Sequence, residues 1–541
     1  MFEIGKDIFK HGFFGASGDR MGHRRMRIIY YVFVAVFIIF VVRTLQLGIE
    51  GTDRSRRAGS DGAWLVQRAD IVDRNGDILA KNIMSGHITL RPPYVKDRDR
   101  VAQTIHEILP YEYTLAQALN LVNSSRKFVY VKKYASESQR SVVEKAKLSG
   151  LEIESEQKRR YPKRRLFSHI IGFVGRDGYG LEGVERTYDD YLRENTEPLR
   201  LSLDARIQAV FYEQLSLAMQ KYQAKAAMGL LMNSRTGEMI AMVSLPDYDP
   251  ENINLDPAKN RLFMPLRGVF EMGSIFKIFN TAMAMENGIN KEYYVAKPFE
   301  IKDKFGRVAA RISDVRTFKP PRPNLTIEEI MLHSCNAGSA QIALDLPDGT
   351  QKEFFHRLHL DETLDLEFGT TEHPLMPAKW GPVEKATLSF GHGISVTPMH
   401  LLLAVNAMTN GGIYIYPTLL KRGVGPIQGE RVLSSDISAR LREVMFHIAE
   451  ETGGKKARVA GVEIGGKTAT AEKYENNKVN HKKNLTAFAG IFPVSAPQYT
   501  ILVILDEPKG TEESFGLRTA AWNAVPTTGK ILDSILPLLF E

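Results

Sequence analysis

The chain has 541 residues, of which 43% are hydrophobic and 25% are charged, the proportions of ordinary globular protein. One hydrophobic core rarely serves a chain of this length, so we expect about two to four domains. The single cysteine, Cys335, excludes an internal disulfide framework and a cysteine-rich metal site. The net charge of +8 suits an anionic surface or polymer, and no nucleic-acid-binding motif accompanies it.

Residues 28–49 form a long and mostly apolar stretch that contains one charged residue, Arg43. Because Arg43 lies near its end, the side chain can snorkel, and about 20 residues suffice to span a bilayer. Basic residues precede the stretch and no small-residue cleavage site follows it. We therefore expect an uncleaved single-pass helix, with residues 1–27 in the cytoplasm and the chain beyond residue 50 outside. A buried core helix is the alternative.

The next part of the chain, residues 50–198, is charged and irregular. Residues 68–80 have the pattern of two strands joined by an Asn-Gly turn. Residues 101–121 and 136–148 have the periodicity of two amphipathic helices.

Two stretches within this part allow a ligand-binding interpretation. Residues 158–165 are strongly basic, which is typical of a solvated face and less often of a polyanion contact. Residues 172–183 are rich in glycine and could pass for a phosphate-binding loop. They lack the strand-loop-helix setting that such a loop requires, so turns are favoured.

From about residue 199 the pattern becomes regular, with strands first, helices in the middle and strands last. A strand leading into a capped helix is expected over 201–222, and a final helix over 528–540. The other expected strands are 227–232, 239–243, 461–470, 484–492 and 499–505. This order predicts an α+β fold with one antiparallel sheet covered by helices.

Ser274 and Lys277 stand at the head of an apolar run that ends at Asn287-Gly288, the pattern of a buried helix. One helical turn places the amine beside the hydroxyl, at a helix start where backbone dipoles favour negative charge. A desolvated amine next to a hydroxyl makes an activated nucleophile. The same spacing occurs in charged surroundings at Ser124 with Lys127 and at Ser155 with Lys158.

Ser334 and Asn336 fall in a break between two helical stretches, 325–332 and 339–344. A hydroxyl and an amide two residues apart can offer a proton relay and a donor to a substrate carbonyl. A helix cap followed by a turn is the structural alternative.

A third chemical stretch covers residues 465–471 and contains Lys467, Thr468 and Thr470. From Gly461 onward it also matches the phosphate-binding pattern G-x-x-x-x-G-K-T. That loop must open a helix, whereas an extended Thr-Ala-Thr-Ala and a turn follow here. We therefore favour a strand edge that receives a substrate carboxylate.

Together and in this order, the three stretches resemble the active-site signatures of the penicillin-binding protein and serine β-lactamase superfamily. The resemblance covers nearly the whole chain and is most specific for class B penicillin-binding proteins, in particular their division-specific peptidoglycan transpeptidases. The supporting stretches are 68–80, 180–185, 236–241, 389–398 and 467–473.

The resemblance implies a cytoplasmic tail (1–27), a transmembrane helix (28–49), an elongated α+β pedestal domain (50–198) and a transpeptidase domain (199–541). It implies a periplasmic enzyme of the inner membrane that needs no cofactor and no metal. Its substrates would be D-Ala-D-Ala stem peptides of peptidoglycan, and β-lactams would inhibit it covalently. An FtsW-type glycan polymerase and other divisome proteins are the implied partners, and nucleic acid is not among them.

The resemblance also implies catalytic roles. Ser274 would attack the penultimate D-alanine carbonyl with Lys277 as base. Ser334 and Asn336 would relay the leaving-group proton and position the peptide. Lys467 completes this catalytic set.

Substrate binding would fall to the third stretch. Lys467, Thr468 and Thr470 would hold the terminal carboxylate, and the backbone amides of Ser274 and Thr470 would form the oxyanion hole. Ala469 stands where the family has glycine. If its methyl group faces the substrate, acylation slows or β-lactam affinity falls.

Three alternatives remain open: an elongation-type transpeptidase, a D,D-carboxypeptidase or β-lactamase, and a scaffold or sensor impaired by Ala469. His392 invites a Ser-His interpretation, but its Gly-His-Gly setting favours a role in shaping a loop.

Overall fold

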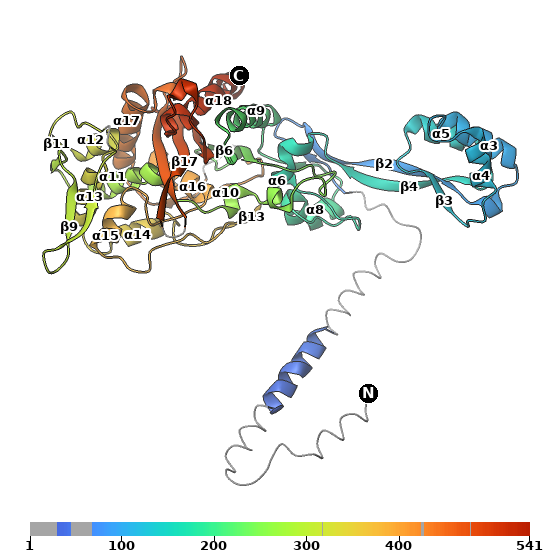
Figure 1. Cartoon of the computed structure of the whole chain (residues 1–541), viewed down its shortest axis with the longest axis horizontal. Coiled ribbons are helices and arrows are strands. Elements are labelled where there is room, and N and C mark those ends of the chain that lie inside the picture. The colour runs from blue at the N-terminus through green and yellow to red at the C-terminus, as the bar shows by residue number, and fades with distance from the viewer. Residues whose placement is uncertain (1–29, 45–67, 316–317, 424–426, 476–477, 541) are drawn as a thin grey trace, which may run out of the picture. The chain divides into compact units, whose positions relative to one another are not determined.

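A computed structural model describes residues 30–44, 68–315, 318–423, 427–475 and 478–540 (Figure 1). The chain divides into two compact units, Met1–Val66 and Gln67–Glu541. In the first unit, residues 30–44 form an α-helix in which every residue is exposed. Among the described residues, no helix combines the length and apolar character needed to cross a membrane. The tail 1–27 and both ends of the expected span 28–49 lie outside the described residues.

The pedestal begins with the hairpin that the sequence predicts. Strand β1 (Ile71–Val72) pairs antiparallel with β2 (Ile78–Leu90), and Gly76 in the turn has a φ of +99° that glycine adopts without strain. Strand β2 continues far beyond the hairpin. It pairs antiparallel with β4 (Leu151–Arg160) and, at its last residues, with β3 (Val129–Lys132).

Three helices pack on this sheet around a core that includes Ile88, Leu90 and Ile105. They are α3 (Arg98–Ile108), α4 (Leu115–Val122) and α5 (Glu137–Ala146). The prediction of one helix over 101–121 is therefore wrong. Pro110 cannot continue the ladder of helical hydrogen bonds, and Thr114 starts a new helix with a complete capping box.

Short helices and turns follow β4. They are η2 (Arg164–Phe167), α6 (Ser168–Ile171), α7 (Gly183–Thr187) and α8 (Asp189–Glu194). The glycine-rich stretch forms turns, as the sequence favoured, closed by a bridge between Val174 and Gly180.

The two arginines at the end of the basic run 158–165 pair with acidic residues of the protein itself. Arg164 pairs with Asp249 at 2.5 Å, and Arg165 pairs with both Asp247 and Asp256. These three acids lie in the segment after β7 (Met239–Leu245) of the second sheet. The run therefore joins the pedestal to the following domain, which argues against a polyanion contact.

The second sheet has the strand order β16-β17-β18-β6-β7, and every neighbouring pair is antiparallel. Its other strands are β6 (Ala226–Asn233), β16 (Gly465–Glu475), β17 (Lys478–Phe492) and β18 (Tyr499–Asp506). The predicted antiparallel sheet is confirmed, and β16 forms one of its edges. Strand β5 (Leu199–Arg200) pairs parallel with β1 and connects the pedestal to this domain.

Helices cover both faces of the sheet (Figure 1). Helices α9 (Ala205–Tyr222) and α18 (Ala524–Leu539) bury side chains such as Phe211 and Ile531 on one face. The predictions of a capped helix ending at residue 222 and of a C-terminal helix are confirmed.

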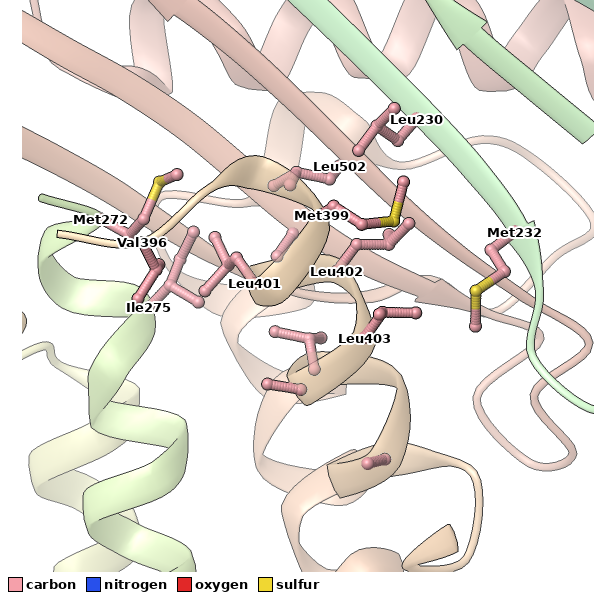
Figure 2. Packing of buried hydrophobic residues seen from close by; sticks show 14 of the residues in the cluster. Leu230, Met232, Met272, Ile275, Val396, Met399, Leu401, Leu402, Leu403 and Leu502 are labelled. Atoms are coloured by element: carbon pink, nitrogen blue, oxygen red, sulfur yellow. The ribbon is translucent and has the colours of Figure 1, made fainter. Parts of the chain in front are cut away.

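The opposite face carries α11 (Lys277–Glu286), α16 (Pro398–Thr409) and α17 (Ser435–Glu451). All twelve residues of α16 are buried, so this helix lies inside the core. Figure 2 shows its Met399 and Leu402 near Leu230 and Leu502 of the sheet, while Leu401 lies toward Ile275. The same core therefore supports the head of α11.

Shorter helices complete this side: α10 (Met264–Arg267), α12 (Ile327–Leu332), α13 (Asn336–Asp345), α14 (Thr350–Arg357) and α15 (Pro382–Leu388). A small hairpin of β9 (Phe299–Lys302) and β10 (Val308–Ile312) precedes α12.

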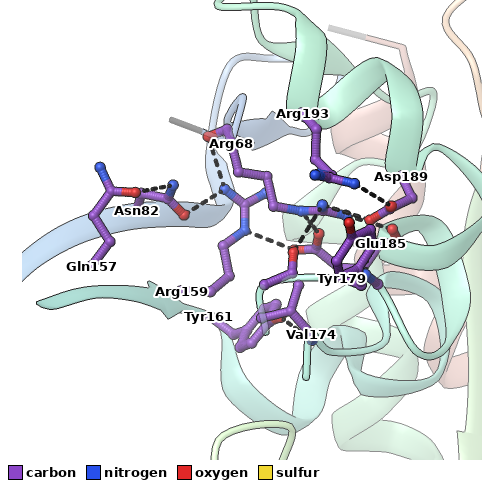
Figure 3. Close-up of polar contacts among 12 residues, drawn as sticks. Arg68, Asn82, Gln157, Arg159, Tyr161, Val174, Tyr179, Glu185, Asp189 and Arg193 are labelled. Carbon is purple, nitrogen blue, oxygen red and sulfur yellow. Dashed lines mark hydrogen bonds and ion pairs between the residues drawn. The ribbon is translucent and has the colours of Figure 1, made fainter. Parts of the chain in front are cut away.

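A buried ion cluster lies at the base of the pedestal (Figure 3). The carboxylate of Glu185, fully buried, accepts from Nε of Arg68 at 2.5 Å and from Nε of Arg159 at 2.7 Å. Arg68 also pairs with Asp189 at 2.7 Å. The Glu185 carboxylate on helix α7 thus links Arg68, which precedes strand β1, to Arg159 on strand β4.

We expect Glu185→Gln to lower the free energy of unfolding by about 3–5 kcal/mol, because it leaves two buried guanidinium groups short of negative charge. Denaturant titration of the full-length chain measures this change. The matched control is Glu300→Gln, which breaks an exposed pair with Arg311 and should cost less than about 1 kcal/mol. Equal midpoints for both variants would contradict the prediction.

Candidate active site

Ser274 lies in a 3-10 turn, η4 (Gly273–Phe276), that leads directly into α11. The sequence places Ser274 at the start of the helix, and the structure shows that this start is a tighter 3-10 turn. The expected neighbourhood is confirmed, because Nζ of Lys277 lies 3.1 Å from Oγ of Ser274. Ser274 is half-buried, and Lys277 is 1% exposed.

A glycine-rich loop holds this turn from one side. Gly391 has a φ of +79°, and a Cβ there would lie 2.3 Å from the carbonyl oxygen of Gly273. The Glu271 carboxylate accepts from the backbone N–H of Gly393 at 2.9 Å and lies 3.1 Å from Nδ1 of His392. His392 thus shapes the loop. Sequence reasoning missed Glu271, since no local pattern marks a contact to a distant loop.

Ser334 and Cys335 lie in the predicted break between α12 and α13, and Asn336 opens α13; these three residues are called the turn below. Ser334 has a φ of +57°, which is uncommon for a residue other than glycine. This conformation presents two acceptors to Nζ of Lys277: the Ser334 carbonyl oxygen at 2.6 Å and the Asn336 Oδ1 at 2.7 Å. The Ser334 hydroxyl lies 3.2 Å from the same Nζ.

Lys467 reaches the same turn from the edge strand β16. Its Nζ donates to the Ser334 hydroxyl at 2.9 Å, and its side chain is 1% exposed. The sequence predicted a strand edge with Lys467 offered to a carboxylate. The structure confirms the strand. It also shows that the Lys467 amine is more deeply buried than the hydroxyl groups of Ser334, Thr468 and Thr470.

The two threonines of this strand have more exposed side chains than Lys467. Thr468 and Thr470 are both half-buried. The hydroxyl of Thr470 accepts from the backbone N–H of Ala520 at 3.1 Å, which fixes its orientation. The strand continues to Glu475, and since no helix follows Lys467, the phosphate-binding interpretation is excluded.

Burial sets the electrostatics of the two lysines. Desolvation lowers the pKa of Lys277 to about 8. Desolvation and the nearby Lys277 charge together lower the pKa of Lys467 well below its usual value. A neutral Lys277 amine has two N–H groups, which suit the Ser334 carbonyl oxygen and Asn336 Oδ1. Its lone pair is then left for the Ser274 hydroxyl.

Ala469 does not lie as the sequence interpretation supposed. Side chains alternate along a strand, and Ala469 shares the buried face of β16 with Lys467. It is 1% exposed and belongs to the core cluster that also contains Ile275. Its methyl group therefore packs against the protein interior and is not presented to a substrate.

Cys335 is a fully buried packing residue. Burial raises the pKa of its thiol to about 12, so the thiol stays protonated. Its sulfur accepts from the Gly338 N–H at the start of α13. Among the described residues, no group of three or more His, Cys, Asp or Glu side chains could hold a metal ion.

The two other S-x-x-K matches have no comparable geometry. Ser155 and Lys158 lie on β4, where residues three apart point to opposite faces. Ser124 lies in a bend after α4, and Lys127 is exposed. Only the Ser274 match, of the three, joins a buried lysine to residues from distant parts of the chain.

A serine nucleophile beside a desolvated amine, a Ser/Asn turn and a second buried lysine on an edge strand define the class of serine acyl-transfer proteins. Residues 227–526 match the family described as "Penicillin binding protein transpeptidase domain". Residues 64–210 match "Penicillin-binding Protein dimerisation domain". The chain belongs to the penicillin-binding proteins, and this pair of domains places it in class B.

Proteins named as peptidoglycan D,D-transpeptidases are similar in sequence to most of this chain. "Probable peptidoglycan D,D-transpeptidase FtsI" of Caulobacter vibrioides is 32% identical, and the match covers 93% of this chain and 87% of the relative. "Peptidoglycan D,D-transpeptidase FtsI" of Escherichia coli K12 is 27% identical, with 87% and 83% covered. A peptidoglycan synthetase structure from Bifidobacterium adolescentis shares the fold, with a TM-score of 0.65 at 18% identity over 87% of this chain and 95% of that one.

We expect Ala469→Gly to leave the reaction rate with a fluorescent penicillin within about twofold, since a buried methyl group does not meet the ligand. It should lower the free energy of unfolding by about 1–2 kcal/mol, through lost burial and added backbone freedom. The control is Ala487→Gly, the buried partner of Ala469 on β17. A large rate increase in Ala469→Gly alone would show that the methyl group obstructs the site.

Proposed function

We propose that this protein is a peptidoglycan D,D-transpeptidase that cross-links stem peptides through an acyl-enzyme on Ser274, in septal wall synthesis during cell division. The observation that carries the proposal is the position of Lys277. Its Nζ lies 3.1 Å from the Ser274 hydroxyl, and carbonyl-type oxygens at 2.6 and 2.7 Å hold it there. The D,D-transpeptidase names of its relatives over most of the chain support the same activity.

In the proposed first step, the neutral Lys277 amine takes the Ser274 proton while the oxygen attacks the penultimate D-alanine carbonyl. The backbone amides of Ser274 and Thr470 stabilise the oxyanion. The C–N bond then breaks, and the departing D-alanine amine receives the proton that Lys277 took from Ser274, relayed through the Ser334 hydroxyl, so that Lys277 is neutral again. Asn336 positions the peptide with its side-chain amide.

In the second step, an amine of a neighbouring stem peptide attacks the acyl-enzyme and loses its proton to the Lys277 amine. The C–O bond to Ser274 breaks, Lys277 returns the proton to the serine oxygen, and the new amide is the cross-link. Thr468 and Thr470 hold the substrate carboxylate by hydroxyl donation, while the buried Lys467 donates a hydrogen bond to the Ser334 hydroxyl from the protein side. Ala469 contributes by its backbone on the edge strand.

The remaining features of the proposal concern location and partners. We assign residues 1–27 to the cytoplasm, 28–49 to a transmembrane helix, 50–198 to the pedestal and 199–541 to a periplasmic transpeptidase domain. The apolar sequence of 28–49 supports the anchor in the inner membrane. The FtsI names of the relatives support a divisome setting with an FtsW-type polymerase. β-Lactams are the expected covalent inhibitors.

We expect fluorescent penicillin to label the full-length chain covalently, with the label mapped to Ser274 by peptide analysis. Ser274→Ala should abolish labelling because the hydroxyl forms the acyl bond. Ser155→Ala, at another S-x-x-K match, is the control and should label normally. Label on a different residue would refute the assignment, and rapid loss of label to water would favour a hydrolase.

The acylation rate should rise with pH up to about 8 and level off above it. A lysine with its pKa lowered to about 8 is mostly protonated below that pH and cannot accept the serine proton. Between pH 6 and 7 the rate should increase about tenfold, following the neutral fraction. Stopped-flow penicillin fluorescence measures the profile, and a rate that falls with rising pH over this range would contradict Lys277 as base.

A further inference from the structure

Asp314 contacts the active-site turn from a segment that the three sequence signatures do not include. It follows strand β10, and its side chain is partly buried. One carboxylate oxygen accepts from the backbone N–H of Asn336, and the other accepts from the Cys335 thiol at 3.3 Å. Both residues of the turn that follow Ser334 are thus held by one carboxylate.

The Asp314 carboxylate provides a hydrogen-bond acceptor that the start of helix α13 otherwise lacks. The first N–H groups of a helix lack partners within the helix, and Asn336 is the first residue of α13. A carboxylate at this end also meets the positive end of the helix dipole. Without it, the left-handed conformation of Ser334 would rest on fewer contacts.

The position of the turn decides where Lys277 points. Two of its hydrogen-bond partners, the Ser334 carbonyl oxygen and Asn336 Oδ1, belong to the turn. A shift of the turn would release both amine hydrogens, and the lone pair would no longer be directed at Ser274. Asp314 is therefore connected to the nucleophile through Asn336 and Lys277.

Charge provides a second link between Asp314 and Lys277. The charged groups near Lys277 are Asp314 and Lys467 from β16, because the neighbouring Cys335 thiol stays protonated. Lys467 opposes a charged Lys277, and burial opposes it further. Asp314 acts in the other direction and raises the pKa of Lys277 against the effect of burial.

We propose that Asp314 is a positioning residue for acyl transfer, which holds the Ser334–Cys335–Asn336 turn against Lys277 and supplies a negative charge near that buried lysine. The inference rests on the proposed role of Lys277 as base. Asp314 itself touches neither Ser274 nor, in the proposed mechanism, the substrate.

Two variants separate the effects of shape and charge. Asp314→Asn keeps an oxygen for the Asn336 N–H and removes the charge, so the midpoint of the pH profile of acylation should move down by about half a unit or more. Asp314→Ala removes the contact as well, and the rate at high pH should fall about tenfold or more. Glu300→Gln, on the neighbouring strand β9, is the control and should change neither.

The measurement is the rate of fluorescent penicillin labelling of the full-length chain between pH 6 and 10. A purely structural role would lower the rate without moving the midpoint in Asp314→Asn. An unmoved or raised midpoint in Asp314→Asn overturns the inference. If Asp314→Ala does not fold, the result for Asp314→Asn alone is the test. A wild-type chain labelled on Ser274 keeps the proposed function even then, whereas one without Ser274 label overturns both.

Discussion

The active site depends on two buried lysine amines that converge on one hydroxyl. Lys277 and Lys467 approach the Ser334 hydroxyl at 3.2 and 2.9 Å, although each is only 1% exposed. Two positive charges this close in a desolvated place are costly, so at least one amine is driven toward its neutral form. Burial lowers the pKa of Lys277 to about 8 and so supplies a base at moderate pH, and the surrounding acceptors decide which way its lone pair points.

Such an arrangement requires a rigid support. Helix α16, buried along its whole length, fills the space between the sheet and the head of α11. The edge strand β16 carries Lys467, and the Gly391 loop presses on Gly273 without room for a side chain. The core continues into the base of the pedestal, where Ile71 and Phe167 join the same cluster. The buried Glu185 pairs add ionic contacts within that base.

Ala469 shows that the effect of a substitution in a strand motif depends on which face of the strand carries the side chain. A glycine-to-alanine change in a signature suggests a methyl group in the path of the substrate. The twofold alternation of β16 instead directs that methyl group into the interior, on the side of Ile275. The argument for an impaired scaffold therefore loses its physical basis.

By itself the sequence determined the strands of the main sheet, its flanking helices and the one-turn approach of Lys277 to Ser274, because periodicity and capping act over a few residues. It misplaced a single helix across Pro110, where a local breaker outweighed amphipathic spacing. Only the tertiary structure decided that Lys467 faces Ser334, that Glu271 clamps the His392 loop and that Asp314 holds Asn336. These contacts join distant segments, and only the packing of the core brings them within hydrogen-bond distance.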